Sequence, residues 1–314
     1  MKSYTRRSAL KKLTLLGAGS TVFSLPINLG AAVKKPNKPI KLGVITDTHI
    51  GFVPKAETRL TAFLKEMKTV KPDALAQLGD FAFPDAAHQK YADQFNAAHD
   101  VTLHAIGNHD LDKGLKKSDC IKAWDIPARY YTKDVNGIRI IVLDGNDKGS
   151  PTYKSHGGYH KYIAKEQRDW LADQLGKANI PVLVLSHQPM AGPGEVDNGA
   201  EMRALFSQHK SKIIACINGH AHIDHHIESG GVNYLHLNSA SYYWLGGKVR
   251  LAAYKDPLYA TITIDAQAST LTVEGKKSTW EKGTPEDVNY FKGKRADWKQ
   301  FVHPEISSRN IKII

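Results

Sequence analysis

The stretch KIIACINGHAHIDHH, residues 212–226, joins an apolar run to four histidines that fall within seven positions. The apolar part holds isoleucine and small residues, which is typical of a strand buried on both faces of a sheet. The polar part begins where that strand would end. A histidine-rich loop in this place can be a metal site, the base for a nucleophile, or only a polar turn. The decision depends on what the other strands of the chain carry at their ends.

Five apolar runs rich in valine, isoleucine or leucine precede this one, and each leads into a polar turn. They cover residues 40–46, 74–79, 101–107, 138–144 and 181–186. Helical patterns at 57–70 and 164–178 lie between them, each with its apolar residues on one face. Strands that alternate with helices predict an α/β fold with a largely buried sheet. Further on, 232–238 and a hairpin over 259–275 predict additional antiparallel strands.

Residues that commonly bind metal follow most of these runs. They are Asp47 and His49 after the first run, Asp80 after the second, Asn108, His109 and Asp110 after the third, His187 after the fifth, and His220 and His222 after the sixth. Loops at the carboxyl ends of strands converge on one crevice, so this scattered set can form a single site. Carboxylate, imidazole and amide donors without a thiolate suit Mn, Fe or Zn, and their number exceeds the need of one tetrahedral ion. The sequence therefore predicts two divalent transition-metal ions that share one carboxylate.

The motifs DTH (47–49), GD (79–80), GNHD (107–110), SH (186–187) and GHAH (219–222) resemble the five ordered motifs of calcineurin-like metallophosphoesterases. The resemblance covers roughly residues 40–240. It implies a four-layer α/β/β/α sandwich with two packed mixed β-sheets. It also implies two overlapping ligand sets, with Asp80 bridging: Asp47, His49, Asp80 and His222 for one ion, and Asp80, Asn108, His187 and His220 for the other.

The same resemblance implies hydrolysis of a phosphate ester by metal-activated hydroxide. His109 would reach the leaving-group oxygen or an equatorial oxygen, and Asp110 would orient its imidazole. We expect His220 and His222 to serve different ions because side chains alternate in direction along an extended segment. Phe83 stands where purple acid phosphatases carry an iron-ligating tyrosine, so we expect no charge-transfer colour.

Several histidines match no motif. We predict that His225 and His226 are hydrogen-bonded or solvated loop residues, with contact to substrate phosphate as the alternative. His104, His156 and His160 are left without a role. The two cysteines, Cys120 and Cys216, give no disulfide framework, and Cys216 lies inside an apolar run, as a small buried residue does.

Residues 1–32 have the composition of an export signal: a basic start, an interrupted apolar stretch at 13–25 and small residues at 30–32. TRRSALK (5–11) resembles the twin-arginine consensus, with Ala9 in place of the usual phenylalanine. We therefore expect a periplasmic or secreted protein that uses the twin-arginine translocation machinery and keeps no stable membrane span after cleavage. Removing the signal would lower the net charge from +12 to about +7, which suits a phosphate-bearing substrate. The phosphoesterase domain would span 38–280, with 281–314 as an irregular tail packed on or beside it.

The leading hypothesis is an exported enzyme that hydrolyses small organic phosphate mono- or diesters, including nucleotides. Segments 166–175, 182–190 and 196–206 resemble the branch of cyclic-nucleotide phosphodiesterases and ADP-ribose/CDP-alcohol diphosphatases. A nuclease of the same family and a non-catalytic scaffold are the alternatives. We expect no nucleic-acid partner, because the basic run KGKR (292–295) is typical of a solvated loop.

Overall fold

The computed structural model describes residues 33–153, 158–246 and 251–314, so the predicted signal at 1–32 lies outside the described part. One sheet has the strand order β14-β13-β12-β1-β2-β3. Its strands are β1 (Ile40–Ile45), β2 (Ala74–Gln77), β3 (Thr102–His104), β12 (Ala260–Asp265), β13 (Thr270–Gly275) and β14 (Arg309–Lys312). Strands β1, β2 and β3 are parallel, whereas β12, β13 and β14 add antiparallel partners on the other side of β1. This sheet is therefore mixed.

The second sheet has the order β4-β5-β6-β7-β9-β8 and is also mixed. It comprises β4 (Tyr131–Val135), β5 (Ile138–Leu143), β6 (Val182–Ser186), β7 (Ile213–Asn218), β8 (His225–Ser229) and β9 (Val232–His236). Strands β5, β6, β7 and β9 are parallel, and the edge strands β4 and β8 are antiparallel to their neighbours. A separate antiparallel pair joins β10 (Tyr242–Trp244) to β11 (Leu251–Ala253).

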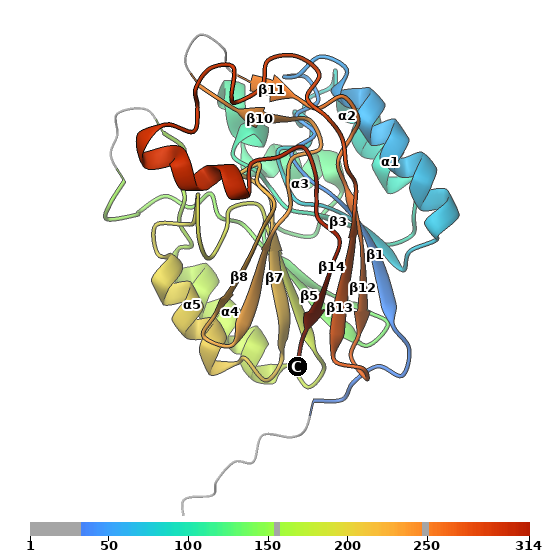
Figure 1. The fold of residues 1–314 in the computed structure, drawn as a ribbon. Coiled ribbons are helices and arrows are strands. Elements are labelled where there is room, and N and C mark those ends of the chain that lie inside the picture. Colours follow the sequence, from blue (N-terminus) through green and yellow to red (C-terminus); the bar gives the residue numbers. More distant parts are fainter. Residues whose placement is uncertain (1–32, 154–157, 247–250) are drawn as a thin grey trace, which may run out of the picture. The chain divides into compact units, whose positions relative to one another are not determined.

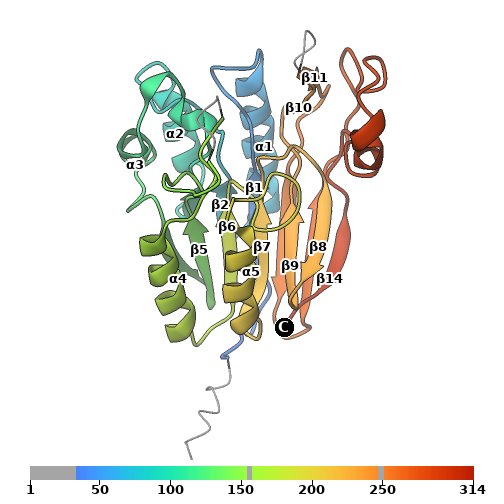
Figure 2. The same cartoon turned by 90° about the vertical axis from the view of Figure 1, so that its left-hand side faces the viewer.

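Helices cover the outer faces of the two sheets (Figures 1 and 2). Helices α1 (Ala56–Val70), α2 (Gln89–Asn96) and α3 (Lys117–Trp124) lie beside the first sheet, and α4 (Lys165–Lys177) and α5 (Gly199–Gln208) beside the second. A Cβ on Gly43 of β1 would lie 2.3 Å from the sulfur of Met67 in α1, so the helix contacts the strand closely. The predicted four-layer α/β/β/α arrangement with two mixed sheets is confirmed.

The alternation of side chains along the strands divides the core in two. In β5, Ile140 and Val142 belong to the large apolar cluster that also takes in β1 and α1. Their neighbours Ile141 and Leu143 belong to a second cluster, with Leu171 of α4 among its members. Because successive residues of a strand point to opposite faces, one apolar strand can contact both the facing sheet and the covering helices.

The structure corrects two predictions outside the motifs. The tail is not wholly irregular: Arg309–Lys312 form β14 at the edge of the first sheet, and a 3₁₀ helix covers Gly293–Gln300. A strand of four residues places only two side chains on each face, which is too few for an alternating pattern of apolar and polar residues to be recognised. His225 and His226 begin strand β8 and do not lie in a loop. Cys120 and Cys216 are both buried free thiols.

Within residues 33–153, 158–246 and 251–314, no helix has the length and apolar character needed to cross a membrane. The helices α2, α3 and α5, which the sequence patterns do not single out, have only eight to ten residues each. Helices this short show too few turns for a clear periodicity.

Candidate metal centre

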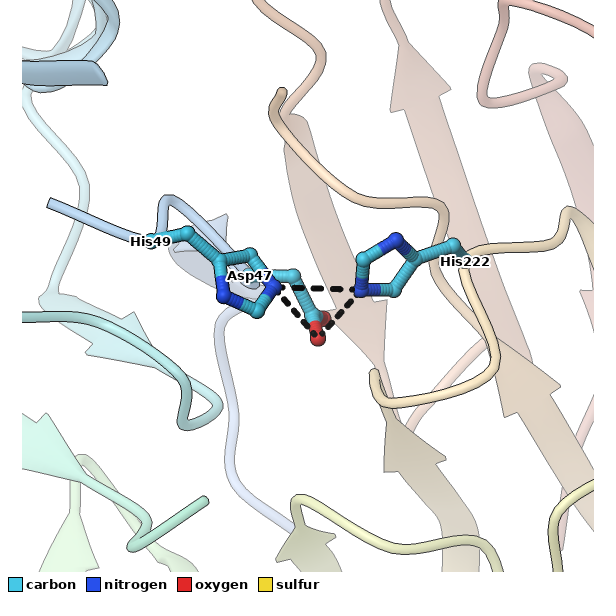
Figure 3. Close-up of side chains that lie close together, drawn as sticks. All are labelled: Asp47, His49 and His222. Carbon is cyan, nitrogen blue, oxygen red and sulfur yellow. Dashed lines mark hydrogen bonds and ion pairs between the residues drawn. The ribbon is translucent and has the colours of Figure 1, made fainter. Parts of the chain in front are cut away.

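The predicted ligands come together where strands of both sheets end. Asp47 and His49 follow β1, Asp80 follows β2, and His187 directly follows β6. Parallel strands point the same way, so the loops after them meet at one edge of the sheet. Figure 3 shows the consequence for His222, which comes from the loop after β7 of the second sheet and faces the Asp47 and His49 side chains of the first.

Asp47, His49 and His222 form one cluster (Figure 3). The Nε2 atom of His222 lies 3.1 Å from Oδ1 of Asp47 and 3.2 Å from Nε2 of His49. Nε2 of His49 lies 3.9 Å from the same Asp47 oxygen. Three donor atoms on buried side chains thus surround one point, and this matches three of the four ligands that the motifs assign to one ion.

A second cluster forms around His187. Its Nε2 atom lies 3.2 Å from Oδ2 of Asp80, 3.1 Å from Oδ1 of Asn108 and 3.2 Å from Nδ1 of His220. The same Asp80 oxygen is 3.8 Å from Nε2 of His49 in the first cluster. Asp80 therefore stands between the two clusters, in the position expected of a bridging carboxylate.

The proton positions in these rings indicate that both clusters suit cations. Nδ1 of His187 lies 2.8 Å from the carbonyl oxygen of Leu78, and Nδ1 of His222 lies 2.8 Å from that of Tyr242. A carbonyl oxygen only accepts, so Nδ1 carries a proton, and Nε2 is the nitrogen that presents its lone pair to the cluster when the ring is neutral. These lone pairs meet other acceptors, the oxygens of Asn108 and Asp47. Convergence of acceptors on one point, with the opposite ring nitrogen held by a carbonyl, is the arrangement of metal-binding histidines.

Buried charge makes the same region attract positive ions. Burial opposes the charge on His187, but Asp80 and Asp47 raise the pKa of its imidazole to about 9, so the two carboxylates hold a proton on this ring where a cation would otherwise offset their charge. Burial also opposes ionisation of Asp47, yet His222 and His187 lower the pKa of that carboxyl to about 2. Burial lowers the pKa values of His49 and His220 to about 3, so both rings are neutral at physiological pH. The site thus offers carboxylates that attract positive charge, beside the neutral nitrogen donors of His49 and His220.

Most of these ligands occupy unusual backbone positions. Asp47, His49, Asp80, His220 and His222 all have positive φ, between 48° and 68°. Non-glycine residues rarely adopt this region, and they tend to do so where function fixes the geometry. His220 and His222 therefore do not lie on an extended segment, which corrects the reason given for their divergence. They still diverge, His220 toward His187 and His222 toward His49.

Two glycines allow the loops to approach the ligands. A Cβ at Gly219 would lie 2.1 Å from Oγ1 of Thr46 and 2.3 Å from Oδ2 of Asp47. A Cβ at Gly107 would lie 2.2 Å from both the amide nitrogen and Oδ1 of Asp80. No side chain fits at such distances, so the glycines of the GHAH and GNHD motifs are required by close packing against the ligands.

The structure corrects the predicted role of Asp110. Its two carboxylate oxygens accept hydrogen bonds from the backbone amides of Asp80, Phe81 and Gly107, at 2.8–2.9 Å. The imidazole of His109 is oriented instead by Asp112, whose Oδ2 lies 2.8 Å from Nδ1. Asp110 follows His109 directly in a helical turn, and adjacent residues there do not face each other, whereas residues three apart do. Asp110 therefore shapes the loops that carry Asp80 and Gly107.

Residue Tyr159 adds to this arrangement, and no sequence motif indicates it. Its hydroxyl donates to Oδ1 of Asp112 at 2.9 Å and lies 3.1 Å from Nδ1 of His109. The spacing of Asp112 from His109 is a signal that could have been used, because GNHDLD places two acids after the histidine. Tyr159 lies fifty residues further along, in a segment without secondary structure, so only the fold brings it here.

The remaining histidines and Phe83 have structural surroundings. His226 hydrogen-bonds Asn233 on the neighbouring strand at 2.9 Å, and the ring of His225 lies 4.9 Å from that of Phe301. His104 is buried and hydrogen-bonds Asn96 at 2.7 Å, and His156 lies outside the described residues. Phe83 is buried and offers no ligand atom. Asp224, His303 and Glu305 form a further group of possible metal ligands.

The fold and the paired clusters define a two-sheet α/β protein with two adjoining groups of candidate metal ligands. The sequence model of the family described as calcineurin-like phosphoesterase matches residues 40–224. The chain therefore belongs to the calcineurin-like phosphoesterase family, whose members use a dinuclear divalent metal centre. It is a metal-dependent phosphoric ester hydrolase.

A relative shares sequence with this chain, and solved structures share its fold. A protein of Synechococcus sp. named "Probable cyclic nucleotide phosphodiesterase" is 25% identical over 199 residues, which cover 58% of this chain and 73% of that protein. A dimetal phosphatase from Danio rerio has a TM-score of 0.58 at 14% identity, covering 76% of this chain and 96% of that one. GAP50 of Plasmodium, described as the anchor in the inner membrane complex, also has a TM-score of 0.58, at 12% identity, covering 88% and 89% of the two chains. The two structures show a shared fold.

Proposed function

We propose that this protein hydrolyses small organic phosphate monoesters or diesters with two divalent transition-metal ions held by the two clusters. The observation that carries the proposal is the position of Asp80, whose Oδ2 faces His187 in one cluster and His49 in the other. A single carboxylate between two sets of nitrogen and oxygen donors suits a pair of ions that share a ligand. Mn, Fe and Zn all bind such donors, and we expect the two ions to be of one or two of these elements.

The chain's own residues divide the remaining tasks. Two ions bound here would offset phosphoryl charge and lower the pKa of a water molecule. Asn108 contributes its amide oxygen to the His187 cluster. His109 lines the cavity next to the clusters, and Asp112 fixes its Nδ1 as the protonated nitrogen. Nε2 of His109 is therefore the atom that can give a proton to the oxygen of the departing alcohol.

The size of the cavity supports a small substrate. It has a volume of about 540 Å³ and reaches from Asp80 and His222 to the surface, which is within the range of small-molecule sites. The printed name of the Synechococcus relative supports nucleotides as one class to test. We further propose that the protein acts in the periplasm or outside the cell after twin-arginine export, on the strength of the signal-like residues 1–32.

The test begins with metal analysis of the purified protein by inductively coupled plasma mass spectrometry. We expect about two transition-metal ions per chain and a colourless solution, because Phe83 cannot supply a phenolate. Hydrolysis is then measured on mono-, di- and pyrophosphate esters with Mn, Zn, Fe and Co. Asn108→Ala should lower both metal content and turnover, whereas Asn310→Ala, an exposed change in β14, should lower neither.

Two results would replace the proposal with an alternative. Protein that binds no metal and hydrolyses no ester would be a non-catalytic scaffold. Cleavage of DNA, with binding that weakens steeply as salt rises, would identify a nuclease. A strong visible absorption band from tyrosine-to-iron charge transfer would contradict the expected ligand set.

A further inference from the structure

Aromatic side chains surround the cavity above the metal centre. Phe52, Trp244 and Tyr159 are 44%, 45% and 43% exposed, and they are three of the four large apolar residues that the described part of the chain exposes. All three line the same cavity. Large apolar side chains are normally buried, and their gathering at one exposed place indicates a binding surface.

The aromatic surface is continuous with the metal ligands. The ring of His49 lies 5.8 Å from that of Phe52 and 5.1 Å from that of His109. The ring of His109 in turn lies 4.9 Å from that of Tyr159. A molecule whose phosphate sits at the metal clusters would therefore bring its organic part directly against these rings.

The C-terminal segment (residues 281–314) also lines the cavity. Tyr290 and Trp298 line it, and the Tyr290 hydroxyl is 2.9 Å from that of Tyr243 in β10. Trp298 in the 3₁₀ helix packs on Phe301, with ring centres 5.8 Å apart. These residues lie beyond position 224, where the family match ends, so the matched part of the chain alone would lack this part of the lining.

The residue types that line this cavity indicate which chemical class of ligand it can bind. Among the described residues, the apolar lining side chains are aromatic apart from Ala221, and none is leucine, isoleucine or valine. Within the same described lining, the ionisable groups other than tyrosine are Asp80, Asp112 and the histidines beside the clusters. Aromatic side chains favour flat π-systems as ligands, which pack against them in offset-stacked or edge-to-face arrangements.

We propose that these aromatic residues form a subsite for a planar aromatic or heteroaromatic ring in the organic group of the ester. The inference rests on the proposed phosphoesterase function and specifies its substrate class. Stacking on such side chains contributes beyond simple burial, by an amount that corresponds to about a 3–10-fold preference for a flat ring. The C-terminal segment is accordingly a determinant of specificity.

The test compares phenethyl phosphate with cyclohexylethyl phosphate. Both esters have a primary alkoxide as leaving group and an organic group of similar apolar size. Proton transfer and simple burial should therefore affect their hydrolysis rates alike. We expect kcat/KM to favour the phenethyl ester by about 3–10-fold, and the phenethyl phosphonate to bind more tightly than the cyclohexylethyl phosphonate by a similar factor in calorimetry. The phosphonate experiment measures binding without turnover.

Three variants assign the preference to the subsite. Trp244→Leu and Trp298→Leu should each reduce the preference for the phenethyl ester by about twofold to threefold, because each change removes one aromatic stacking partner. Trp244 is the more exposed, so its variant is expected to fold normally even if Trp298→Leu does not. The matched control is Trp170→Leu, a change of the same kind in α4, where Trp170 packs on Tyr130 away from the cavity. It should leave the preference unaltered.

The outcomes separate this inference from the proposed function. Equal rates and equal phosphonate binding for the two ring types would overturn the aromatic subsite while the phosphoesterase function stands. Loss of the preference in Trp170→Leu as well would also overturn it. If no ester is hydrolysed, the proposed function fails, and the two phosphonate affinities alone decide whether the subsite exists.

Discussion

At the scale of single residues, two neighbouring side chains of the site point to different partners, and we assign them different tasks. Asn108 and His109 are neighbours in one motif, yet the Asn108 oxygen faces His187 whereas Nδ1 of His109 faces Asp112. The side chains of adjacent residues in a helical turn point in different directions. One motif can therefore serve both tasks, and the two residues should fail differently when they are replaced.

Replacing His109 should impair turnover without loss of metal. We expect His109→Ala to lower kcat by about 10²–10⁴-fold, the range for losing a positioned proton donor or charge-stabilising group. The loss should be smaller for nitrophenyl esters, whose leaving groups need little protonation. Equal losses for alkyl and nitrophenyl esters would assign charge stabilisation to His109, and loss of metal would refute its separation from the ligands.

Asp112 should act only through His109. Asp112→Asn keeps the size of the side chain but weakens its hold on the imidazole, so we expect about a 10–100-fold lower kcat at normal metal content. In the His109→Ala background the same change should have little further effect, because residues that act as a unit are not additive. Full additivity in this double-mutant cycle would contradict the positioning role.

Gly219 should be essential for a reason of space. In Gly219→Ala the new methyl would overlap Thr46 and the Asp47 carboxylate, so we expect loss of metal and reduced stability. The control is Gly176→Ala in helix α4, where a Cβ meets nothing within 4 Å. That change should be neutral or should stabilise by about 0.5–1 kcal/mol. Normal metal content in Gly219→Ala, measured by mass spectrometry, would show that the loop can move away.

Sequence reasoning at this scale selected candidate ligands that the fold brings together, but it assigned the wrong acid to the support of His109. The seven predicted ligands meet in two clusters because residue type and position after a strand are both visible in the sequence. The sequence does not show whether Asp110 or Asp112 orients the imidazole of His109, because both are acids within three residues of it. The positive φ values of Asp47 and His222 are likewise consequences of the assembled loops and have no signal in residue type.

At the scale of elements, Asp224 joins the loop of His222 to the C-terminal segment. The amide of Asp224 donates to the carbonyl of Phe301 at 3.0 Å, and its Oδ2 accepts from the amide of Ser307 at 3.0 Å. Arg309 pairs with the same carboxylate, and His303 lies 3.5 Å from it. Burial opposes the charge, but His303, Ser307 and Arg309 lower the pKa of Asp224, so it is an ionised anchor.

Removing this anchor should release the C-terminal segment before the rest of the domain unfolds. We expect Asp224→Ala to destabilise the protein by about 2–4 kcal/mol, less than for a fully buried pair because Arg309 keeps some access to water. Urea unfolding would measure this, and limited proteolysis should cut between residues 281 and 309. Glu228→Ala, an exposed change on β8, should stay within about 0.5 kcal/mol of wild type. Unchanged proteolysis in Asp224→Ala would contradict the anchor.

The elements that sequence reasoning found are those with a strong period or a long apolar run. Strands β1, β5, β6 and β7 and helices α1 and α4 fall close to the predicted ranges. Strand β14 was missed because its four residues gain their place by pairing with β13, a contact more than thirty residues distant. Pairing of this kind is decided by tertiary structure, and local propensity carries little information about it.

At the scale of the whole molecule, the metal centre depends on both sheets. Asp47 and Asp80 follow strands of one sheet, and His187 and His222 follow strands of the other. The ligands can therefore converge only after most of the chain has folded. If the protein leaves the cytoplasm by the twin-arginine route, which carries folded proteins, the metal centre would be complete before export.

Export should accordingly depend on Arg6 and Arg7 themselves and not on the positive charge of the signal alone. Replacing both with lysine keeps the charge but breaks the arginine pair, so the protein should stay in the cytoplasm as an uncleaved, folded and metal-loaded precursor. Immunoblots of cell fractions would show its place, and metal analysis of the retained protein would show that the site forms before export. Lys2→Arg with Lys12→Arg is the matched control, because it exchanges the same two residue types outside the pair and should be exported normally. Undiminished protein in the periplasm after the Arg6 and Arg7 changes would mean that another route operates, and retained precursor without metal would mean that the centre is filled only after export.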